Sequence, residues 1–221
     1  MIKAIQTYYK GYHFRSRLEA RWAVFFDKAG VKYEYEPEGF DLGAEGWYLP
    51  DFWLPELKMW AEIKPDEVDD AAHRKIWALV LMTQQKATIL SGDPYESVNA
   101  SPSWDSPYEW ALTVPLAPDH PAGKPVGEDY GYNFCVCPIC DSVGFEYMGR
   151  GGRVCQFSGF PAQLGFEHRS PVKRTWEESD LLGHWDCNRY DGEKSYSHDH
   201  PILKAAAQAA RSARFEHGAS G

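Results

Sequence analysis

The apolar residues in the first half of the chain switch between helical and strand spacing in a fixed order, and that order limits the possible folds. Ser16-Arg-Leu-Glu19 has the form of a capping box, and apolar residues then recur at helical spacing until Gly30. The sequence therefore predicts a helix over 17–29. Three segments with strand character follow, at 31–37, 47–54 and 59–64.

A second helix and a fourth strand complete this pattern. Asp69 or Asp70 can cap a helix over 71–82, and the apolar run 87–91 is typical of a buried strand that ends at Gly92. The expected order is α-β-β-β-α-β, so we expect an α/β fold. With 221 residues the chain has room for this domain and a small second module.

The composition changes after residue 93, which places a domain boundary there. Residues 93–133 are rich in Pro, Ser, Gly and Asp, with a short strand candidate at 110–116. We therefore expect a first domain over 1–118, a linker over 119–133 and a small metal-binding module over 134–221. That module has many glycines and little periodicity, and a helix over 202–217 closes it.

The charged residues are unevenly distributed. The formal net charge of −9 argues against binding nucleic acid through bulk electrostatics. Residues 1–32, however, carry seven Lys/Arg against two Asp/Glu, whereas residues 33–70 carry two against twelve. A basic segment beside an acidic one suits metal-dependent phosphodiester chemistry, because cations hold phosphates while carboxylates hold the metal. A solvated surface of mixed sign is the alternative interpretation.

Two of the predicted strands carry charged residues suited to a metal site. Asp51 follows Pro50 in the second predicted strand, and Glu62 and Lys64 lie in the third. Residues i and i+2 of a strand point to the same face, so Glu62 and Lys64 project together. If the strands pair as a hairpin, Asp51 comes near Glu62, and the two carboxylates form a hard oxygen site for Mg²⁺. Taken singly, these residues could also be a turn residue and a solvated strand face.

Glu19 could add a third carboxylate from the first helix. It lies at the edge of the apolar face of the helix, where its side chain could face the sheet. A capping-box glutamate needs no further role, but the two roles are compatible.

At these positions the chain resembles the PD-(D/E)XK nucleases, also called restriction-endonuclease-like, and is most similar to small endonuclease-like proteins of bacteriophages. The motifs are Arg15-Ser-Arg-Leu-Glu-Ala-Arg-Trp22, Leu49-Pro-Asp-Phe-Trp-Leu-Pro55 and Ala61-Glu-Ile-Lys64. With the helix and strand that follow, the resemblance covers residues 1 to about 95. It implies a mixed sheet flanked by helices and hydrolysis of DNA phosphodiester bonds with Mg²⁺ or Mn²⁺.

The resemblance also implies a role for each matching residue. Asp51, Glu62 and Glu19 would hold one or two metal ions, and Lys64 would position the attacking water. The flanking phosphates would be held by Arg15, Arg17 and Arg21, for which an exposed helix face is the alternative. DNA is the expected partner, and a homodimer would allow both strands to be cut.

The cysteines indicate a separate metal site. Their odd count and the crowding in Cys135-Val-Cys-Pro-Ile-Cys140 make a poor disulfide framework. The spacing of Cys137 and Cys140 is that of a zinc knuckle. The sequence predicts a structural Zn²⁺ held by Cys137, Cys140, Cys155 and Cys187, with Cys135, His168 and His184 as alternative ligands. Reduced structural thiols are the other interpretation.

No membrane association is expected. The longest strongly apolar stretch, 77–82, is shorter than the roughly 20 residues of a bilayer span, and the N-terminus lacks the apolar block of a signal peptide. We therefore expect a cytoplasmic protein, located in the host cytoplasm if it is phage-encoded.

The leading function is that of a divalent-metal-dependent DNA endonuclease, which can be selective for DNA structure. One alternative is a catalytically inactive, zinc-containing DNA-binding or scaffold protein with a nuclease-like fold. Another is an acidic interaction protein that mimics DNA.

Overall fold

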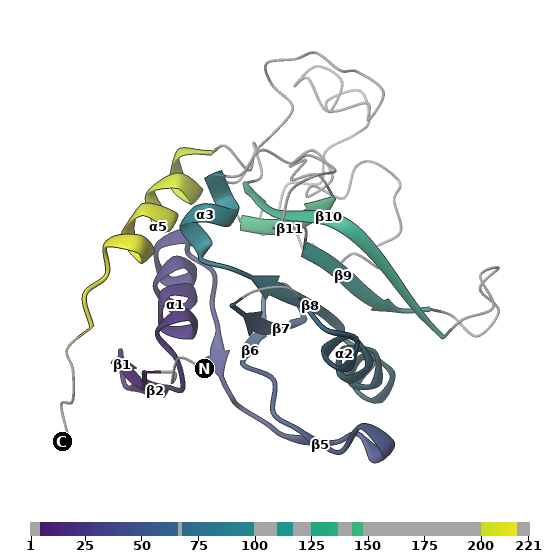
Figure 1. Cartoon of the computed structure of the whole chain (residues 1–221). Helices are drawn as coiled ribbons and strands as arrows, with labels where there is room; N and C mark the ends of the chain where they lie inside the picture. The colour runs from purple at the N-terminus through teal and green to yellow at the C-terminus, as the bar shows by residue number, and fades with distance from the viewer. Residues whose placement is uncertain are drawn as a thin grey trace, which may run out of the picture.

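The computed structural model describes residues 5–65, 68–99, 110–116, 125–136, 143–147 and 200–215. Helices and strands alternate along these residues, as in a mixed α/β protein (Figure 1). The helical elements are α1 (Arg17–Ala29), η1 (Gly43–Glu45), α2 (Asp70–Thr83), α3 (Pro94–Asn99) and α5 (Pro201–Ser212). The strands are β1 (Thr7–Tyr9), β2 (Tyr12–Phe14), β3 (Glu34–Tyr35), β4 (Phe40–Asp41), β5 (Trp47–Tyr48), β6 (Phe52–Leu54), β7 (Met59–Lys64), β8 (Lys86–Ser91), β9 (Trp110–Pro115), β10 (Val126–Val136) and β11 (Val143–Tyr147).

One mixed sheet organises the molecule. Its seven strands lie in the order β11-β10-β9-β8-β7-β6-β3. The pair β7–β8 is parallel, and α2 provides the crossover between these two strands. The other neighbouring strands of the sheet pair antiparallel. Two short hairpins, β1–β2 and β4–β5, lie outside this sheet.

The first helix begins and ends as its sequence predicts. The side chain of Ser16 accepts a hydrogen bond from the backbone N–H of Glu19, which caps the N-terminus of α1. Gly30 ends the helix in the left-handed region, with φ of 77°. The second predicted helix is likewise capped by Asp69, whose side chain accepts from the backbone N–H of Ala72. These local signals fix both helices to within a residue or two of the predicted bounds.

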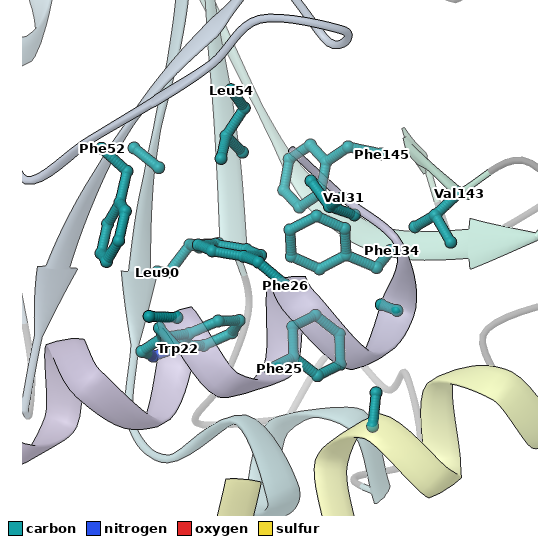
Figure 2. Packing of buried hydrophobic residues seen from close by; sticks show 14 of the residues in the cluster. Trp22, Phe25, Phe26, Val31, Phe52, Leu54, Leu90, Phe134, Val143 and Phe145 are labelled. Atoms are coloured by element: carbon teal, nitrogen blue, oxygen red, sulfur yellow. The ribbon is translucent and has the colours of Figure 1, made fainter. Parts of the chain in front are cut away.

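The two faces of the sheet are covered by different helices. The helices α1, α3 and α5 lie together on one face, and α2 lies on the other (Figure 1). On the first face, Trp22, Phe25 and Phe26 of α1 pack against Phe52 of β6 and Phe134 of β10 (Figure 2). Aromatic rings from three elements that are distant in sequence thus form one core, and their burial supplies the main apolar stabilisation of the domain.

The terminal helix packs on this same core. Ala206, Ala207 and Ala210 of α5 are fully buried, and their small side chains allow α5 to approach α1 closely. The helix ends earlier than the predicted 202–217, because Ala213 adopts an extended conformation. From there Phe215 reaches the ring of Tyr9, at a centroid distance of 6.3 Å.

The predicted order of the first six elements is confirmed, with differences in the strands. The expected strand over 47–54 is split into β5, which pairs with β4, and β6, which pairs with β7. The hairpin β1–β2 and the short β4 and α3 were not predicted. Their apolar residues are too few to show a period.

The segment expected to be a linker also differs from the prediction. Residues 126–133 of the predicted linker 119–133 belong to β10, which pairs with β9 in the main sheet. The glycines and charged residues of this strand conceal its alternation, and the pairing shifts between Asp129 and Tyr132. The start of the predicted second module, up to Tyr147, therefore extends the sheet of the first domain.

Most of the predicted zinc module lies outside the described residues. This applies to Cys137, Cys140, Cys155 and Cys187, and to the alternative ligands His168 and His184. Cys135, the remaining alternative, is buried in β10. Among the described helices, none has the length and apolar character that a membrane crossing requires.

Candidate active site

The β6–β7 hairpin brings Asp51 and Glu62 together. Its register pairs Phe52 with Ala61 and Trp53 with Trp60. Continued by one residue, this register places Asp51 opposite Glu62. Both carboxylates then lie on the face of the sheet that carries Trp53 and Trp60, which is the face covered by α2.

Asp51 is buried, and its carboxylate accepts two short hydrogen bonds. Its Oδ1 accepts a hydrogen bond from Nη2 of Arg15 at 2.7 Å. Its Oδ2 accepts from the backbone N–H of Ile63, also at 2.7 Å. The second bond ties the carboxylate to β7, so the position of Asp51 is fixed by the pairing of the strands.

Glu62 is buried beside it and is held by a tyrosine and a lysine. Its Oε2 accepts from the hydroxyl of Tyr48 at 2.8 Å, and its Oε1 accepts from Nζ of Lys64 at 2.7 Å. Glu62 and Lys64 therefore share one face of β7, as the alternation predicts. Ile63 between them belongs to the aromatic core on the opposite face.

Glu19 comes to the site from the first turn of α1. Its Oε1 accepts from Oγ of Ser16 at 2.7 Å, and its Oε2 accepts from the backbone N–H of Arg15 at 3.0 Å. The hydroxyl of Tyr35 donates to the same Oε2 at 2.6 Å. The capping role that the sequence indicates is thus present. In addition, the negative charge of Glu19 acts on Asp51, so both roles considered for this residue are compatible with its place.

Burial and the charges of the two glutamates act on Asp51. Burial raises the pKa of Asp51 to about 8, and the charges of Glu62 and Glu19 add to this shift. The N–H of Ile63 and the guanidinium of Arg15 oppose it without cancelling it. A charged Asp51 is therefore costly at this buried place, and a bound cation would lower that cost.

The pKa values of two residues next to the carboxylates, Tyr48 and Glu36, are also raised. Burial, followed by the charge of Glu62, raises the pKa of Tyr48 well above its usual range, so the hydroxyl stays protonated and donates to Glu62. Burial also raises the pKa of Glu36, although the nearby Arg15 opposes the shift. Glu36 follows Tyr35 of β3, and its backbone N–H donates to the carbonyl of Asp51 at 2.9 Å.

Glu62 and Lys64 line a cleft of about 610 Å³, whereas Asp51 and Glu19 are not among its lining residues. Its walls come from the N-terminal segment of α1, from β5, from the end of β7 and from the first turns of α2. The lining residues are Arg15, Trp47, Tyr48, Leu49, Glu62, Lys64, Asp69, Ala71, Ala72 and Lys75. Three of them are cationic, so the cleft can hold an anion next to the acidic cluster.

The three predicted phosphate-binding arginines have different surroundings. Arg15 forms ion pairs with Asp51 and, through Nε at 2.5 Å, with Glu36. Arg21 pairs with Asp93 at 2.6 Å, which ties α1 to the start of α3. Arg17 is half-buried on α1. Of the three, Arg15 alone lines the cleft, and its guanidinium is over half exposed.

Several residues of the site were missed by sequence reasoning. Tyr48, Tyr35 and Glu36 hold the carboxylates or Arg15, and Trp47 and Lys75 line the cleft. Tyr48 stands three residues before Asp51 and Glu36 lies in the alternating segment after α1, so both were near a recognised motif. Lys75 offered no signal, because its place depends on how α2 crosses over the sheet.

In the part of the chain that the structure describes, no three His, Cys, Asp or Glu side chains are grouped closely enough to hold a metal ion. The carboxylate oxygens of Asp51 and Glu62 are directed instead to Arg15, Ile63, Tyr48 and Lys64. The donor set still fits a divalent cation, because carboxylates are its preferred ligands and the charges of Glu62 and Glu19 act on the buried Asp51.

In comparisons with known proteins, no family model, no curated protein and no solved structure matches this chain.

Proposed function

We propose that this protein is a divalent-metal-dependent DNA endonuclease with a restriction-endonuclease-like core. The observation that carries the proposal is a buried Asp51 on which the charges of two further buried carboxylates, Glu62 and Glu19, act, with Glu62 and its partner Lys64 lining one cleft. The three carboxylates come from α1, from the residue before β6 and from β7. A set of like charges assembled by three separate elements has no evident structural purpose, because burying it opposes folding.

The metal would be Mg²⁺ or Mn²⁺, held by Asp51 and Glu62 with Glu19 as a third ligand. When bound, it would polarise the scissile phosphate and neutralise the negative charge that develops during the reaction. The charges of Glu62 and Glu19 act on Asp51, so the three carboxylates are neighbours. Their present partners, Arg15 and Lys64, are partly exposed side chains that can move aside.

The residues of the chain would position the reacting groups. The Nζ of Lys64 can donate a hydrogen bond to the attacking water or to a phosphate oxygen, because a third of its side chain is exposed to the cleft. The water oxygen would bond to phosphorus as the P–O bond to the sugar breaks on the opposite side. The attacking water gives up one proton to solvent, and the departing sugar oxygen takes up one from solvent. Tyr48 remains protonated and keeps Glu62 in place during this step.

DNA is the proposed partner because the cleft combines the acidic cluster with cations. Arg15, Lys64 and Lys75 line the walls where a phosphodiester backbone would pass. Arg15 would exchange its carboxylate partners for a phosphate when DNA and metal bind together, since it bonds phosphate and carboxylate in the same way. A homodimer would allow two such sites to act on opposite strands.

A cleavage assay tests this function. Plasmid, linear, single-stranded and branched DNA would be incubated with Mg²⁺ or Mn²⁺, with Lys64→Ala and Asp51→Asn run beside the wild type. We expect cleavage that requires the metal and is lost in both variants. Wild-type protein that leaves every DNA form intact would contradict the proposal.

A second candidate is a catalytically inactive DNA-binding or scaffold protein with the same fold. The ion pairs Arg15–Asp51 and Lys64–Glu62 favour it, because they satisfy much of the acidic cluster with internal cations. Such a protein would bind DNA without cleaving it. Its affinity would also be indifferent to Mg²⁺ at constant ionic strength, whereas a nuclease site should bind the metal.

The zinc module is a separate proposal that rests on the spacing of Cys137 and Cys140 alone. Elemental analysis of the purified protein would test it. We expect about one zinc ion per chain, as one knuckle site implies, and its loss in Cys137→Ser together with Cys140→Ser. An unchanged zinc content in that variant would exclude the knuckle as the binding site.

A further inference from the structure

Trp47 is the most exposed large apolar side chain among the described residues. Its exposed fraction is 69%, although the residue pairs in a β-hairpin and lines the same cleft as Glu62 and Lys64. An indole in water at the edge of a polar cleft has no role in the core. Its position is better explained by a partner that covers the ring.

The hairpin that carries Trp47 is held in place. In β4–β5, Asp41 pairs with Trp47 and Phe40 pairs with Tyr48. Leu42 and Tyr48 are buried in the cluster beneath α2. The 3-10 turn between the strands is tied to α2 by Arg74, whose Nε lies 3.4 Å from Oε2 of Glu45. The ring is therefore presented by an anchored hairpin that extends beyond the sheet next to α2 (Figure 1).

Gly39 leaves space for the indole of Trp47. A Cβ atom added at Gly39 would lie 2.9 Å from Cε2 and 3.2 Å from Nε1 of Trp47, closer than side chains normally approach. The absence of a side chain at Gly39 thus leaves room for the indole to lie against the backbone at this point. A flat aromatic group supported on one side is suited to stacking on a flat ligand at its free surface.

The chemistry of the cleft identifies that ligand. Arg15, Lys64 and Lys75 line the same cavity, and the Nζ of Lys75 lies 5.8 Å from the ring centre of Tyr48, next to Trp47 in sequence. A cationic wall beside an exposed indole matches a nucleotide, whose phosphate is anionic and whose base is a planar aromatic ring. In an intact duplex both faces of each base are covered by its neighbours, so such stacking requires a base that has left the duplex.

We propose that Trp47 stacks on an unpaired nucleobase next to the phosphate held in the cleft. The substrate of the site is then DNA with unpaired bases, as in single strands, strand ends or branch points, in preference to continuous duplex. This inference rests on the proposed function and names its substrate class.

Binding measured by fluorescence anisotropy tests the inference without relying on cleavage. A labelled 12-nucleotide single strand and a blunt duplex of matching sequence would be titrated with protein in Ca²⁺, which has the charge of Mg²⁺ but coordinates oxygen less rigidly. We expect the wild type to prefer the single strand. Trp47→Ala should weaken single-strand binding by roughly 5- to 150-fold while changing duplex binding by no more than about two-fold.

Three further variants make the test specific. Trp47→Phe should retain most of the single-strand affinity, because the ring is kept. Gly39→Ala should weaken it while leaving the tryptophan in place, because the new methyl group displaces the indole from the space beside Gly39. Trp77→Ala is the matched control, since Trp77 is also exposed, at 43%, but does not line the cleft. A 2-aminopurine base in the single strand should be quenched by the wild type and not by Trp47→Ala.

The outcomes separate this inference from the function on which it rests. A wild type that binds single strand and duplex equally, or a Trp47→Ala variant that loses both equally or neither, overturns the stacking role while the endonuclease proposal stands. A wild type that binds no DNA contradicts the proposed function and this inference together. Thermal melting of each variant verifies that the fold is retained, as expected for a change at an exposed position.

Discussion

The two faces of β7 have different chemistry although their residues alternate along a single strand. Met59, Ala61 and Ile63 point into the aromatic core beneath α1. Trp60 packs on the opposite face beneath α2, and further along that face come Glu62 and Lys64. One face is closed by large apolar rings, whereas the other opens at its end into a cleft of about 610 Å³.

This difference indicates how the chain tolerates a cluster of buried carboxylates. Burial and the neighbouring carboxylates make a charged Asp51 unfavourable, as its raised pKa indicates, so the cluster destabilises the folded state. The aromatic face makes the opposite contribution, because Trp22, Phe25 and Phe26 are fully buried and pack ring against ring. Stability and the proposed chemistry are thus assigned to opposite faces of the same strand.

Removing a ring from the aromatic face should have the largest effect on stability. Phe26 is fully buried and packs against Trp22, Phe52 and Phe134. We expect Phe26→Ala to lower the free energy of unfolding by about 3–5 kcal/mol, through lost burial and the cavity left behind. Urea unfolding followed by circular dichroism would measure this. In Trp47→Ala, on the exposed hairpin, the change should stay within about 0.5 kcal/mol.

On the face of β7 that carries Glu62 and Lys64, a substitution should reduce cleavage strongly and stability little. We expect Lys64→Ala to reduce metal-dependent cleavage by about 10²- to 10³-fold, as for the loss of one preorganised donor at a reacting phosphate. Its stability should change little, because the lysine is partly exposed. Lys32→Ala is the control, since Lys32 forms an exposed ion pair with Glu56. If both variants cut DNA at the wild-type rate, Lys64 has no part in the reaction.

The sequence predicted the aromatic face and the motif residues better than the cleft. The capping box at Ser16 and the left-handed stop at Gly30 are local signals, so the bounds of α1 followed from them. The alternation of β7 placed Ile63 on one side and Glu62 with Lys64 on the other. Each of these inferences uses only residues that are close in sequence.

The surroundings of the site depend on contacts between distant segments. Arg15 was predicted to bind phosphate, but the pairing of β3 with β6 places Glu36 and Asp51 beside it. Residues 126–133 of β10 were expected to be a linker, because glycines interrupt the alternation of this strand and its pairing with β9 shifts between Asp129 and Tyr132. Such contacts depend on the register of the whole sheet, which no short motif encodes.

Metal binding should stabilise the acidic face. At Mg²⁺ concentrations near 100 times the dissociation constant, we expect the free energy of unfolding to rise by about 2.7 kcal/mol. Thermal melting with and without Mg²⁺ at constant ionic strength would show it. The increase should vanish in Glu62→Gln and persist in Asp93→Asn, because Asp93 pairs with Arg21 outside the cleft. An equal increase in all three proteins would indicate non-specific binding.

The pH dependence of the free energy of unfolding should reveal the raised pKa of Asp51. In the folded chain its pKa is raised to about 8, whereas its ordinary value is 3.8. Between these values the folded state holds a proton that the unfolded chain has released, so stability falls as the pH rises through this window. Asp51→Asn removes this proton. In a chelating buffer, its stability relative to the wild type should therefore increase from pH 5 to pH 8 by up to about 4 kcal/mol, because each pH unit in this window is worth about 1.36 kcal/mol.

Parallel pH profiles of the wild type and Asp51→Asn would contradict this assignment. Glu45→Gln is a suitable control, because Glu45 lies in the η1 turn, where its ion pair with Arg74 is largely exposed. Its profile should follow that of the wild type. The experiment needs no DNA, so it tests the electrostatics of the cluster apart from any activity.

The smallest expected effect concerns Glu19, the carboxylate that α1 contributes to the site. The Oγ of Ser16 accepts from the backbone N–H of Glu19 and donates to its carboxylate. We expect Ser16→Ala to lower stability by about 1 kcal/mol, through loss of the N-cap. Cleavage should fall less than about ten-fold, because the carboxylate of Glu19 loses only one hydrogen bond, worth about 1 kcal/mol. It keeps two others, from the hydroxyl of Tyr35 and the backbone N–H of Arg15.

Glu19→Gln separates the two roles of this residue. It preserves the size of the side chain and its ability to accept a hydrogen bond, but it removes the charge that acts on Asp51. If Glu19 holds the metal, this variant should bind Mg²⁺ more weakly than Ser16→Ala does, although its thermal stability in a chelating buffer is equal or higher. If Mg²⁺ binding is unchanged in Glu19→Gln, Glu19 serves only as a helix cap. The site would then consist of the β6–β7 hairpin alone.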